Sequence, residues 1–249
     1  MIKKLLQRVF SKKDKSAKHE PTKQHARTHQ GADHNAKRIS SKTHRIDRRL
    51  LSNAAVKTTE GLQKAGFEAY IVGGAVRDLL LKKRPKDFDV ATDATPEQVN
   101  RVFRRSRIIG RRFRLVHVMF GDETIEVSTF RGSHLGESDD NQVADSGRIL
   151  RDNVFGTQEE DAVRRDFTAN ALYYDPATEE VLDFHNGVAD IQAGVLKMIG
   201  DPVTRYREDP VRMLRAVRFA VKLNGKIDPA SEEPLQSMAG LIENVPASR

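Results

Sequence analysis

The sequence of 249 residues contains no cysteine. This absence excludes a disulfide framework, a thiolate zinc site and a cysteine nucleophile, and it fits a reducing compartment. Long apolar runs are also lacking, and none approaches the roughly 18 residues of a membrane-spanning helix. The first ten residues, MIKKLLQRVF, have too short an apolar core for a secretory signal and lack a small-residue cleavage site. We therefore expect a cytoplasmic protein.

Acidic residues are scarce in the first 49 positions, which hold 15 of the 43 Lys and Arg but only 4 of the 35 Asp and Glu. This segment carries a net charge of +11, so the rest of the chain carries −3 of the total of +8. Its composition predicts a disordered basic tail over residues 1–45. The tail could be a solubilising extension, or an electrostatic arm for RNA or an anionic membrane surface. Apolar residues within residues 2–10 suit a weak peripheral membrane contact.

A short glycine-rich turn stands at the centre of the ordered pattern. The apolar run 70–72 reads as a strand and is followed directly by Gly73 and Gly74, which allow a sharp turn and close approach to an anion. Asp87 and Asp89 then share one face of the next extended segment. Two adjacent carboxylates repel each other unless a cation lies between them, and a divalent metal is the usual one. This combination predicts phosphoryl or nucleotidyl transfer.

The hydrophobic periodicity predicts an α/β (α+β) head over residues 46–200, with a central mixed sheet, and an all-helical neck over residues 201–249. The expected elements are a first helix from about Ile46 to Gly66, the strand at 70–72, a helix over 95–103, strands over 113–120, 124–130 and 181–184, and helices from 201 onward and near 234–242. Residues 132–148 are polar and rich in glycine and serine, so we expect a mobile loop or flap there.

The segment GGAVRDLLLKKRPKDFDV resembles the signature of the class II template-independent nucleotidyltransferases, within the DNA polymerase beta superfamily. These are the bacterial poly(A) polymerases and the tRNA CCA-adding enzymes. A glycine pair alone is typical of an ordinary turn, but Arg77, Asp78 and the Asp-x-Asp that follow make the match specific. Later motifs extend it over about residues 50–249. The resemblance implies that Gly73, Gly74, Arg77 and Asp78 bind a nucleotide.

The resemblance also implies a metal-dependent reaction. Asp87 and Asp89 would hold two Mg²⁺ ions, one activating the 3′-hydroxyl of an RNA and the other stabilising the leaving pyrophosphate. Members of this superfamily usually take a third carboxylate from a neighbouring strand, and Glu126 is the candidate by its position. An exposed strand glutamate is an equal alternative for Glu126.

The triplet Arg164, Arg165 and Asp166 resembles the RRDFT motif of the same family. A pair of arginines suits phosphate recognition, and an aspartate suits a ribose hydroxyl or the support of a metal site. Asp166 is therefore predicted to be a third essential acid. Taken without the resemblance, the triplet would be a solvated helix face.

A third motif, Glu208 and Asp209 with Arg212 and Arg215, resembles the segment that selects the nucleotide base. Members at positions i, i+4 and i+7 from Glu208 share one face of a helix. An acid and an arginine held there can satisfy the hydrogen-bonding edge of a base. The alternative is a salt-bridged helix surface.

Residues 101–114 carry seven arginines and no acid. The part IIGRRFRLVHVMF is very similar to the segment that distinguishes poly(A) polymerases from CCA-adding enzymes. Arg111, Arg112 and Arg114 would anchor the triphosphate of ATP or the RNA backbone. The resemblance thus favours addition of AMP from ATP to RNA 3′ ends. CCA addition to tRNA, and a non-catalytic RNA-binding scaffold acting with RNA-degradation or RNA-chaperone proteins, remain alternatives.

Family members carry further helical body and tail regions that grip the RNA. This sequence ends at ENVPASR. The resemblance therefore predicts a fragment or a truncated product, monomeric, whose hold on RNA is weaker than that of a longer chain.

Overall fold

The computed structural model describes residues 36–110, 114–132, 141–143, 149–152 and 154–245. The predicted basic tail up to residue 35, most of the predicted flap, and Arg111 with Arg112 lie outside these residues. Residues 33–249 form one compact unit, so the boundary expected at residue 200 stays a prediction. In the part of the chain that is described, no helix is long and apolar enough to cross a membrane.

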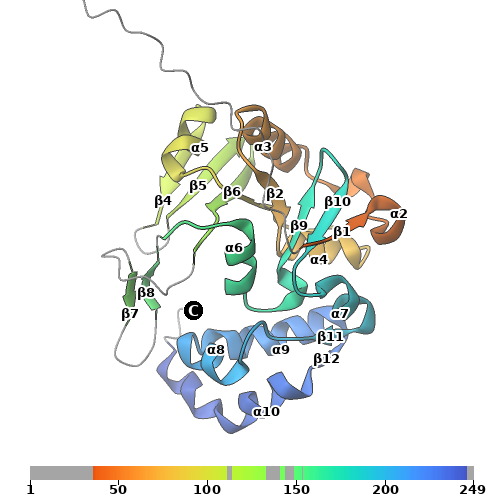
Figure 1. Ribbon diagram of the computed structural model, residues 1–249, viewed down its shortest axis with the longest axis vertical. Coiled ribbons are helices and arrows are strands. Elements are labelled where there is room, and N and C mark those ends of the chain that lie inside the picture. The colour runs from red at the N-terminus through yellow and green to blue at the C-terminus, as the bar shows by residue number, and fades with distance from the viewer. Residues whose placement is uncertain (1–35, 111–113, 133–140, 144–148, 153, 246–249) are drawn as a thin grey trace, which may run out of the picture. The chain divides into compact units, whose positions relative to one another are not determined.

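A mixed sheet of eight strands forms the centre of this unit, as predicted (Figure 1). The strand order is β1-β10-β9-β2-β3-β6-β5-β4, and only the β3–β6 pair is parallel. The strands are β1 (Lys37–Ser40), β2 (Ala69–Val72), β3 (Asp89–Thr92), β4 (Ser106–Ile109), β5 (Leu115–Phe120), β6 (Glu123–Thr129), β9 (Leu172–Asp175) and β10 (Glu180–Asp183). Two small sheets pair β7 (Asn141–Val143) with β8 (Ile149–Asp152) and β11 (Val195–Leu196) with β12 (Lys226–Ile227).

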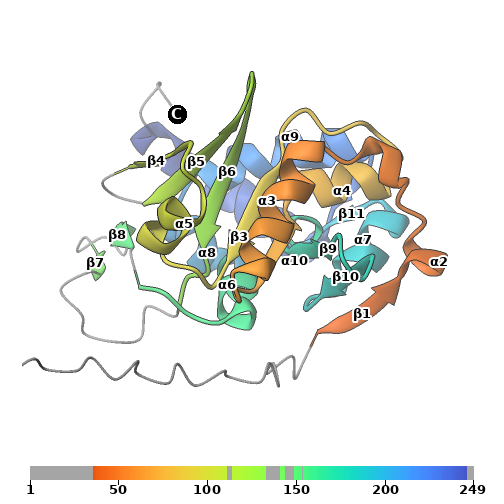
Figure 2. The same cartoon turned by 90° about the horizontal axis from the view of Figure 1, so that it is seen from above.

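Helices cover the sheet and continue beyond it. They are α2 (Ser41–His44), α3 (Asn53–Lys64), α4 (Gly74–Leu80), α5 (Pro96–Val102), α6 (Gln158–Arg164), α7 (Gly187–Ala193), α8 (Pro202–Glu208), α9 (Val211–Leu223) and α10 (Pro229–Ser237), with 3-10 turns η1 (Arg48–Leu50), η2 (Thr168–Asn170) and η3 (Ala239–Asn244). Figures 1 and 2 show α3 and α5 against one side of the β2–β6 region, and Figure 1 shows α8, α9 and α10 gathered at the bottom of its view.

The alternation of apolar residues explains how the sheet is covered. Val90, Val116 and Val127 point into the larger core, to which α3 and α5 contribute. The opposite face around β2, β3 and β9 carries a second cluster that includes Tyr173 and Phe130. This face is covered only in part, so the start of β3 can present Asp89 to solvent.

The ordered chain begins earlier than the sequence predicts. Lys37–Ser40 forms β1 at the edge of the sheet, where Ile39 faces Val181 of β10 and is almost fully buried. The tail expected over residues 1–45 is therefore too long by about ten residues. Composition cannot detect such a strand, because one buried side chain and the backbone hydrogen bonds of a free sheet edge are enough to hold it.

The region from residue 201 is mostly helical, but the all-helical neck predicted over 201–249 is wrong, because β12 lies within it and pairs with β11. Its helices are also interrupted where the sequence pattern looks continuous. α8 ends at Glu208, Asp209 is extended with φ −148° and ψ 95°, and Pro210 precedes α9. Proline disfavours the helical conformation of the residue before it and removes a backbone donor, which explains the break. The helix expected near 234–242 instead begins at Pro229, after Asp228.

Replacing Ile39 by alanine should lower the free energy of unfolding by about 2 kcal/mol, because it removes a buried side chain from the edge of the core. Lys37→Ala, in the same strand but exposed, should change it by less than about 0.5 kcal/mol. Urea titration of both variants measures the difference. Equal stability of the two variants would mean that β1 does not hold the chain end to the sheet.

Candidate active site

A pocket of about 510 Å³ lies beside the glycine turn that follows β2. Residues from α4, from the start of β3, from the segment after α6 and from α9 line it. They are Gly73, Gly74, Arg77, Asp89, Arg165, Asp166, Asn170, Asp209, Val211, Arg212, Arg215 and Phe219. Four guanidinium groups face three carboxylates, so the pocket has a positive balance that favours an anionic ligand.

Gly73 shapes the pocket floor through its backbone. Its φ of 70° and ψ of −128° suit glycine, and an added Cβ would lie 3.4 Å from a guanidinium nitrogen of Arg165. Its N–H donates to the carbonyl of Leu172 at 3.2 Å, which ties the end of β2 to β9. The predicted role of the glycine pair as a sharp turn beside an anion site is consistent with this geometry.

Arg77 is buried at the floor and held on several sides. Its Nε and Nη2 donate to one oxygen of Asp78 at 3.0 and 2.8 Å, and its Nη1 donates to Asn170 at 2.5 Å. Its guanidinium lies 4.9 Å from the ring centre of Phe219. The other oxygen of Asp78 pairs with Lys222 at 2.7 Å. Asp78 is not among the lining residues, so the structure gives it contacts with cations of α4 and α9.

Arg165 is fixed by two residues that were not among the predicted site residues. Its Nη2 and Nε donate to Asp161 at 2.9 and 3.1 Å, and its Nε also contacts the hydroxyl of Tyr173 at 3.1 Å. The Tyr173 hydroxyl itself donates to Asp161 at 2.7 Å. Burial opposes the charge of Arg165, but Tyr173 and Asp161 outweigh it and raise the pKa of Arg165. The spacing of four between Asp161 and Arg165 on α6 is the signal that could have identified the pair.

Asp166 is buried and fully engaged. One of its oxygens accepts from the backbone N–H of Phe167 at 2.8 Å and from the amide of Asn170 at 3.1 Å. The other accepts from the guanidinium of Arg215 on α9 at 2.6 Å. The structure therefore brings Asp166 and Arg215 together, and its predicted part in the chemistry stays a prediction.

The predicted base-selecting set does not share one helix, because Pro210 separates α8 from α9. Glu208 still accepts from Arg212 at 2.8 Å across this break, and it accepts from Arg205 at 2.9 Å. Asp209, Arg212 and Arg215 line the pocket, whereas Glu208 lies behind Arg212. The expected single helix face is thus wrong, but Glu208 and Arg212 do meet, while Arg215 pairs with Asp166.

Arg205 joins α8 to the end of α6. Its Nη2 donates to the backbone carbonyls of Arg164 and Arg165 at 2.6 and 2.7 Å. A helix C-terminus leaves carbonyl groups without intrahelical partners, and a guanidinium satisfies them. The backbone at Arg165 is therefore held from α8 while its side chain is held by Asp161.

The remaining predicted cations lie outside the pocket lining. Arg164 donates to the carbonyl of Gly132 at 2.7 Å, and burial lowers its pKa to about 10. Arg114 pairs with Glu97 of α5, and this hydrogen bond lowers the pKa of Glu97. Arg111 and Arg112 lie outside the described residues, so the cluster predicted with Arg114 stays a prediction.

Carboxylates gather at the start of β3. Asp89 is paired in register with Glu126 of the neighbouring β6, and Asp87 precedes it by two residues. Partial burial and the charges of Glu126 and Asp87 raise the pKa of Asp89 to about 6, while Arg165 opposes the rise. A carboxylate with further negative charges beside it is a donor suited to a divalent cation.

The donor set suits Mg²⁺ bound together with a substrate. Within the described residues, no three His, Asp or Glu side chains are grouped closely enough to hold a metal alone. Mg²⁺ typically takes one or two carboxylates and completes its shell with water and substrate phosphates. Asp87 and Asp89 fit that pattern, and a third carboxylate from Glu126 stays a prediction.

Comparison with known proteins gives consistent matches. Residues 69–197 match the Poly A polymerase head domain family. Poly(A) polymerase I of Salmonella typhimurium is 56% identical over 214 residues, which are 85% of this chain and 46% of that protein. The CCA-adding enzyme of Bacillus subtilis is 41% identical over 188 residues, 76% of this chain and 45% of the other. The chain thus spans about half the length of the curated relatives it matches.

A solved structure supports the same fold. The Bacillus stearothermophilus CCA-adding enzyme in complex with CTP matches with a TM-score of 0.66 and 33% identity. The match covers 78% of this chain and 45% of that one. The mixed sheet with its surrounding helices is therefore a nucleotidyltransferase fold.

Replacing Asp161 by asparagine should destabilise the protein by about 3 kcal/mol, because a buried guanidinium then loses its counter-charge. Glu159→Gln, on the same helix but exposed, should cost about 1 kcal/mol or less. Urea titration measures both. A small effect of Asp161→Asn would show that Tyr173 and the backbone suffice to hold Arg165.

Asp89→Asn should raise the melting temperature of the metal-free protein at pH 7.5. A carboxyl whose pKa is raised on folding destabilises the folded state above that pKa of about 6, and this penalty is absent below its unfolded pKa near 4. The gain should therefore shrink between pH 7.5 and pH 5. Thermal melts in EDTA measure it, with Asp122→Asn in the exposed β5–β6 turn as control. A gain that is independent of pH would contradict the prediction.

Proposed function

The chain belongs to the poly(A) polymerase head domain family, and on this premise we propose that it adds AMP from ATP to the 3′-hydroxyl of RNA without a template. The observation that carries this proposal is the pocket itself. It combines the glycine turn, Asp89 and four arginines in one space of about 510 Å³, which suits a nucleoside triphosphate. The higher identity to a poly(A) polymerase than to a CCA-adding enzyme supports adenylate addition.

In this reaction the 3′-oxygen of the RNA forms a bond to the α-phosphorus of ATP. The bond between that phosphorus and the oxygen bridging to the β-phosphate breaks, pyrophosphate leaves, and the hydroxyl proton passes to solvent. Mg²⁺ bound by Asp87 and Asp89 would supply charge neutralisation and a more acidic 3′-hydroxyl. Such transfers depend mainly on positioning and electrostatic stabilisation.

The chain's own residues provide that positioning. Arg77 and Arg165 are rigid because their donors are partly occupied by buried acceptors, and they face the pocket with fixed positive charge. Such preorganised cations can neutralise the triphosphate without reorganising during the reaction. On the opposite wall, Asp209 offers acceptors and Arg212 offers donors to the edge of a base.

This chain spans only about half the length of its relatives, so its activity is a proposal. CCA addition by the same fold is the main alternative, and an RNA-binding scaffold without catalysis is the second. CCA addition requires CTP as well as ATP, and a scaffold requires no catalytic carboxylates. Two experiments therefore separate these alternatives from the proposal.

With an unstructured RNA primer and Mg²⁺, ATP alone should support extension by many nucleotides, whereas CTP alone should support little. The reason is that Asp209 and Arg212 are proposed to read the base at every cycle, so the same nucleotide is selected each time. Denaturing gel electrophoresis of labelled primers measures the products. Addition that depends on CTP and stops after three nucleotides would identify CCA addition instead.

Asp87→Ala and Asp89→Ala should each lower the rate of extension by about 10³-fold or more, because each removes a proposed metal ligand. Binding of RNA, measured by fluorescence anisotropy, should remain nearly unchanged. Asp122→Ala is the matched control, since it removes a carboxylate from an exposed turn outside the pocket. Full extension by the Asp89 variant would refute the metal assignment, and binding without extension in the wild type would favour the scaffold.

A further inference from the structure

In the described part of the chain, one face of the sheet beside the pocket, over strands β6, β5 and β4, carries exposed and half-buried side chains. On the covered side, Val127, Val116 and Val118 are buried in the core. On the open side, the side chains of Glu126 and His117 are 49% and 35% exposed, and Arg107 is exposed. This face therefore presents polar side chains to solvent next to the carboxylates.

The register of the strands places four of these residues in one row. Asp89 of β3 pairs with Glu126 of β6, Glu126 pairs with His117 of β5, and His117 pairs with Arg107 of β4. Paired residues in neighbouring strands point to the same face of a sheet. The row thus leads straight from the carboxylates of the site to the outer strand.

The charge changes sign along this row. Asp89 and Glu126 are acids, while the ring nitrogen of His117 lies 3.7 Å from a Glu126 oxygen, and Arg107 ends the row with a permanent positive charge. No hydrogen bond or ion pair of the Arg107 side chain is found with the described part of the chain. Its donors are thus available to an anion.

Apolar side chains flank the row on the same face. Ile109 pairs with Leu115 on one side of it, and Met119 lies two residues from His117 on the other. All three are only half-buried. A row that ends in a cation and has apolar borders suits the end of a single nucleic-acid strand, since a phosphate needs a cation and bases need apolar surface.

The nucleotide pocket meets this row only at Asp89. Glu126, His117 and Arg107 are not among its lining residues, which come instead from α4, α9 and the segment after α6. A second substrate must still bring its hydroxyl to the same carboxylates. The open strands offer it a route from the side opposite α9.

We propose that the last nucleotides of the RNA lie across the open face of β6, β5 and β4, with a backbone phosphate on Arg107 and the 3′-hydroxyl toward Asp89. This assignment rests on the proposed function and names the path of its RNA substrate. Three strand spacings of about 4.8 Å separate Arg107 from Asp89, or roughly 14 Å. That length matches about four stacked nucleotides at roughly 3.4 Å each, and fewer in an extended strand.

The polarity follows from the charges. Phosphates are repelled by Glu126, so the strand places its terminal sugar near the acids and its first bound phosphate farther along the row. His117 lies between, where its ring can contact a base or a sugar. Arg107 is therefore a positioning residue for the RNA and has no part in binding ATP.

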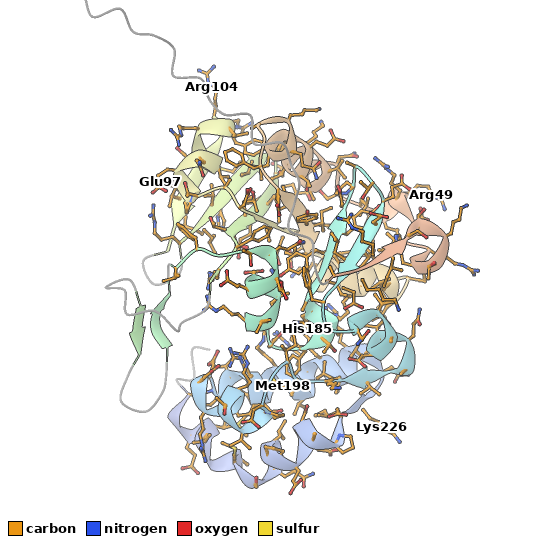
Figure 3. All side chains as sticks on the ribbon, in the orientation of Figure 1. Arg49, Glu97, Arg104, His185, Met198 and Lys226 are labelled. Atoms are coloured by element: carbon orange, nitrogen blue, oxygen red, sulfur yellow. The ribbon has the colours of Figure 1, made fainter. Side chains whose placement is uncertain are left out.

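The same arginine-rich segment supplies a matched control. Arg104 is three residues before Arg107, is exposed, and in Figure 3 points outward at the top of the view, away from α8–α10. Arg104→Ala and Arg107→Ala remove the same charge from the same segment. Any difference in RNA binding between the two variants is therefore due to the position of the arginine and not to the net charge.

The test compares the full chain and both variants with a 5′-labelled oligoadenylate of 12 nucleotides that keeps its free 3′-hydroxyl. Arg107→Ala should weaken RNA binding about fivefold at low salt and reduce the slope of log affinity against log salt by about 0.7. The KM for RNA should rise by a similar factor, while the KM for ATP should stay unchanged. Arg104→Ala should change each of these values by less than twofold.

Two further measurements keep the outcomes distinct. A photoreactive base at the penultimate position should crosslink to β6 or β5, and His117→Ala should reduce the crosslink to β5. Equal effects of the Arg104 and Arg107 variants, or a crosslink confined to α8–α10, would overturn the assignment. If the wild type binds RNA through Arg107 but adds no AMP, the proposed function fails while the RNA path stands.

Discussion

A guanidinium group that leaves water must keep its hydrogen bonds, and this requirement organises the site. Arg77 and Arg165 lie in the floor of the pocket, and each is enclosed by an aspartate of its own helix and by an acceptor from another element. Asn170 serves both, through its side chain to Arg77 and its backbone carbonyl to Arg165 at 3.4 Å. The cost of burying two cations is thus offset locally, and what remains is fixed positive charge facing a space of nucleotide size.

The same principle connects the helical region to the sheet. Arg215 of α9 completes Asp166, and Lys222 of the same helix completes Asp78. Each of these buried aspartates thus has a cation from α9 in addition to its donors from the head. The wall that carries the proposed base contacts is therefore part of the electrostatics of the floor. Separating α9 from the sheet would expose uncompensated carboxylates as well as apolar surface.

Much of this arrangement was predictable from local patterns. The glycine turn, the position of Asp89 on a strand and the helix α5, which Thr95 and Gln98 cap, all depend on residues within a few positions of each other. The family resemblance extended these patterns to the later motifs. Local signals of this kind persist in the sequence because backbone conformation is set largely by near neighbours.

The features that were missed depend on distant partners. β1 exists because β10 offers a free edge, and nothing in its own four residues shows that. Asp161 looks like one acid among several at the start of α6, and only the fold reveals that Tyr173 lies beside it. Pro210 indicates a helix break, but the apolar spacing on both sides of it suits one continuous helix, and the pattern as a whole therefore predicted a single helix.

The link that Arg205 makes between α8 and α6 is sensitive to mutation at Arg205 but not at the two residues that it contacts. Its bonds to residues 164 and 165 end on backbone carbonyls, which every amino acid possesses. Substitutions at those two positions would leave the link between α8 and α6 intact, whereas substitution of Arg205 would remove it entirely. In evolutionary terms, the connection is robust at one end and depends on a single codon at the other.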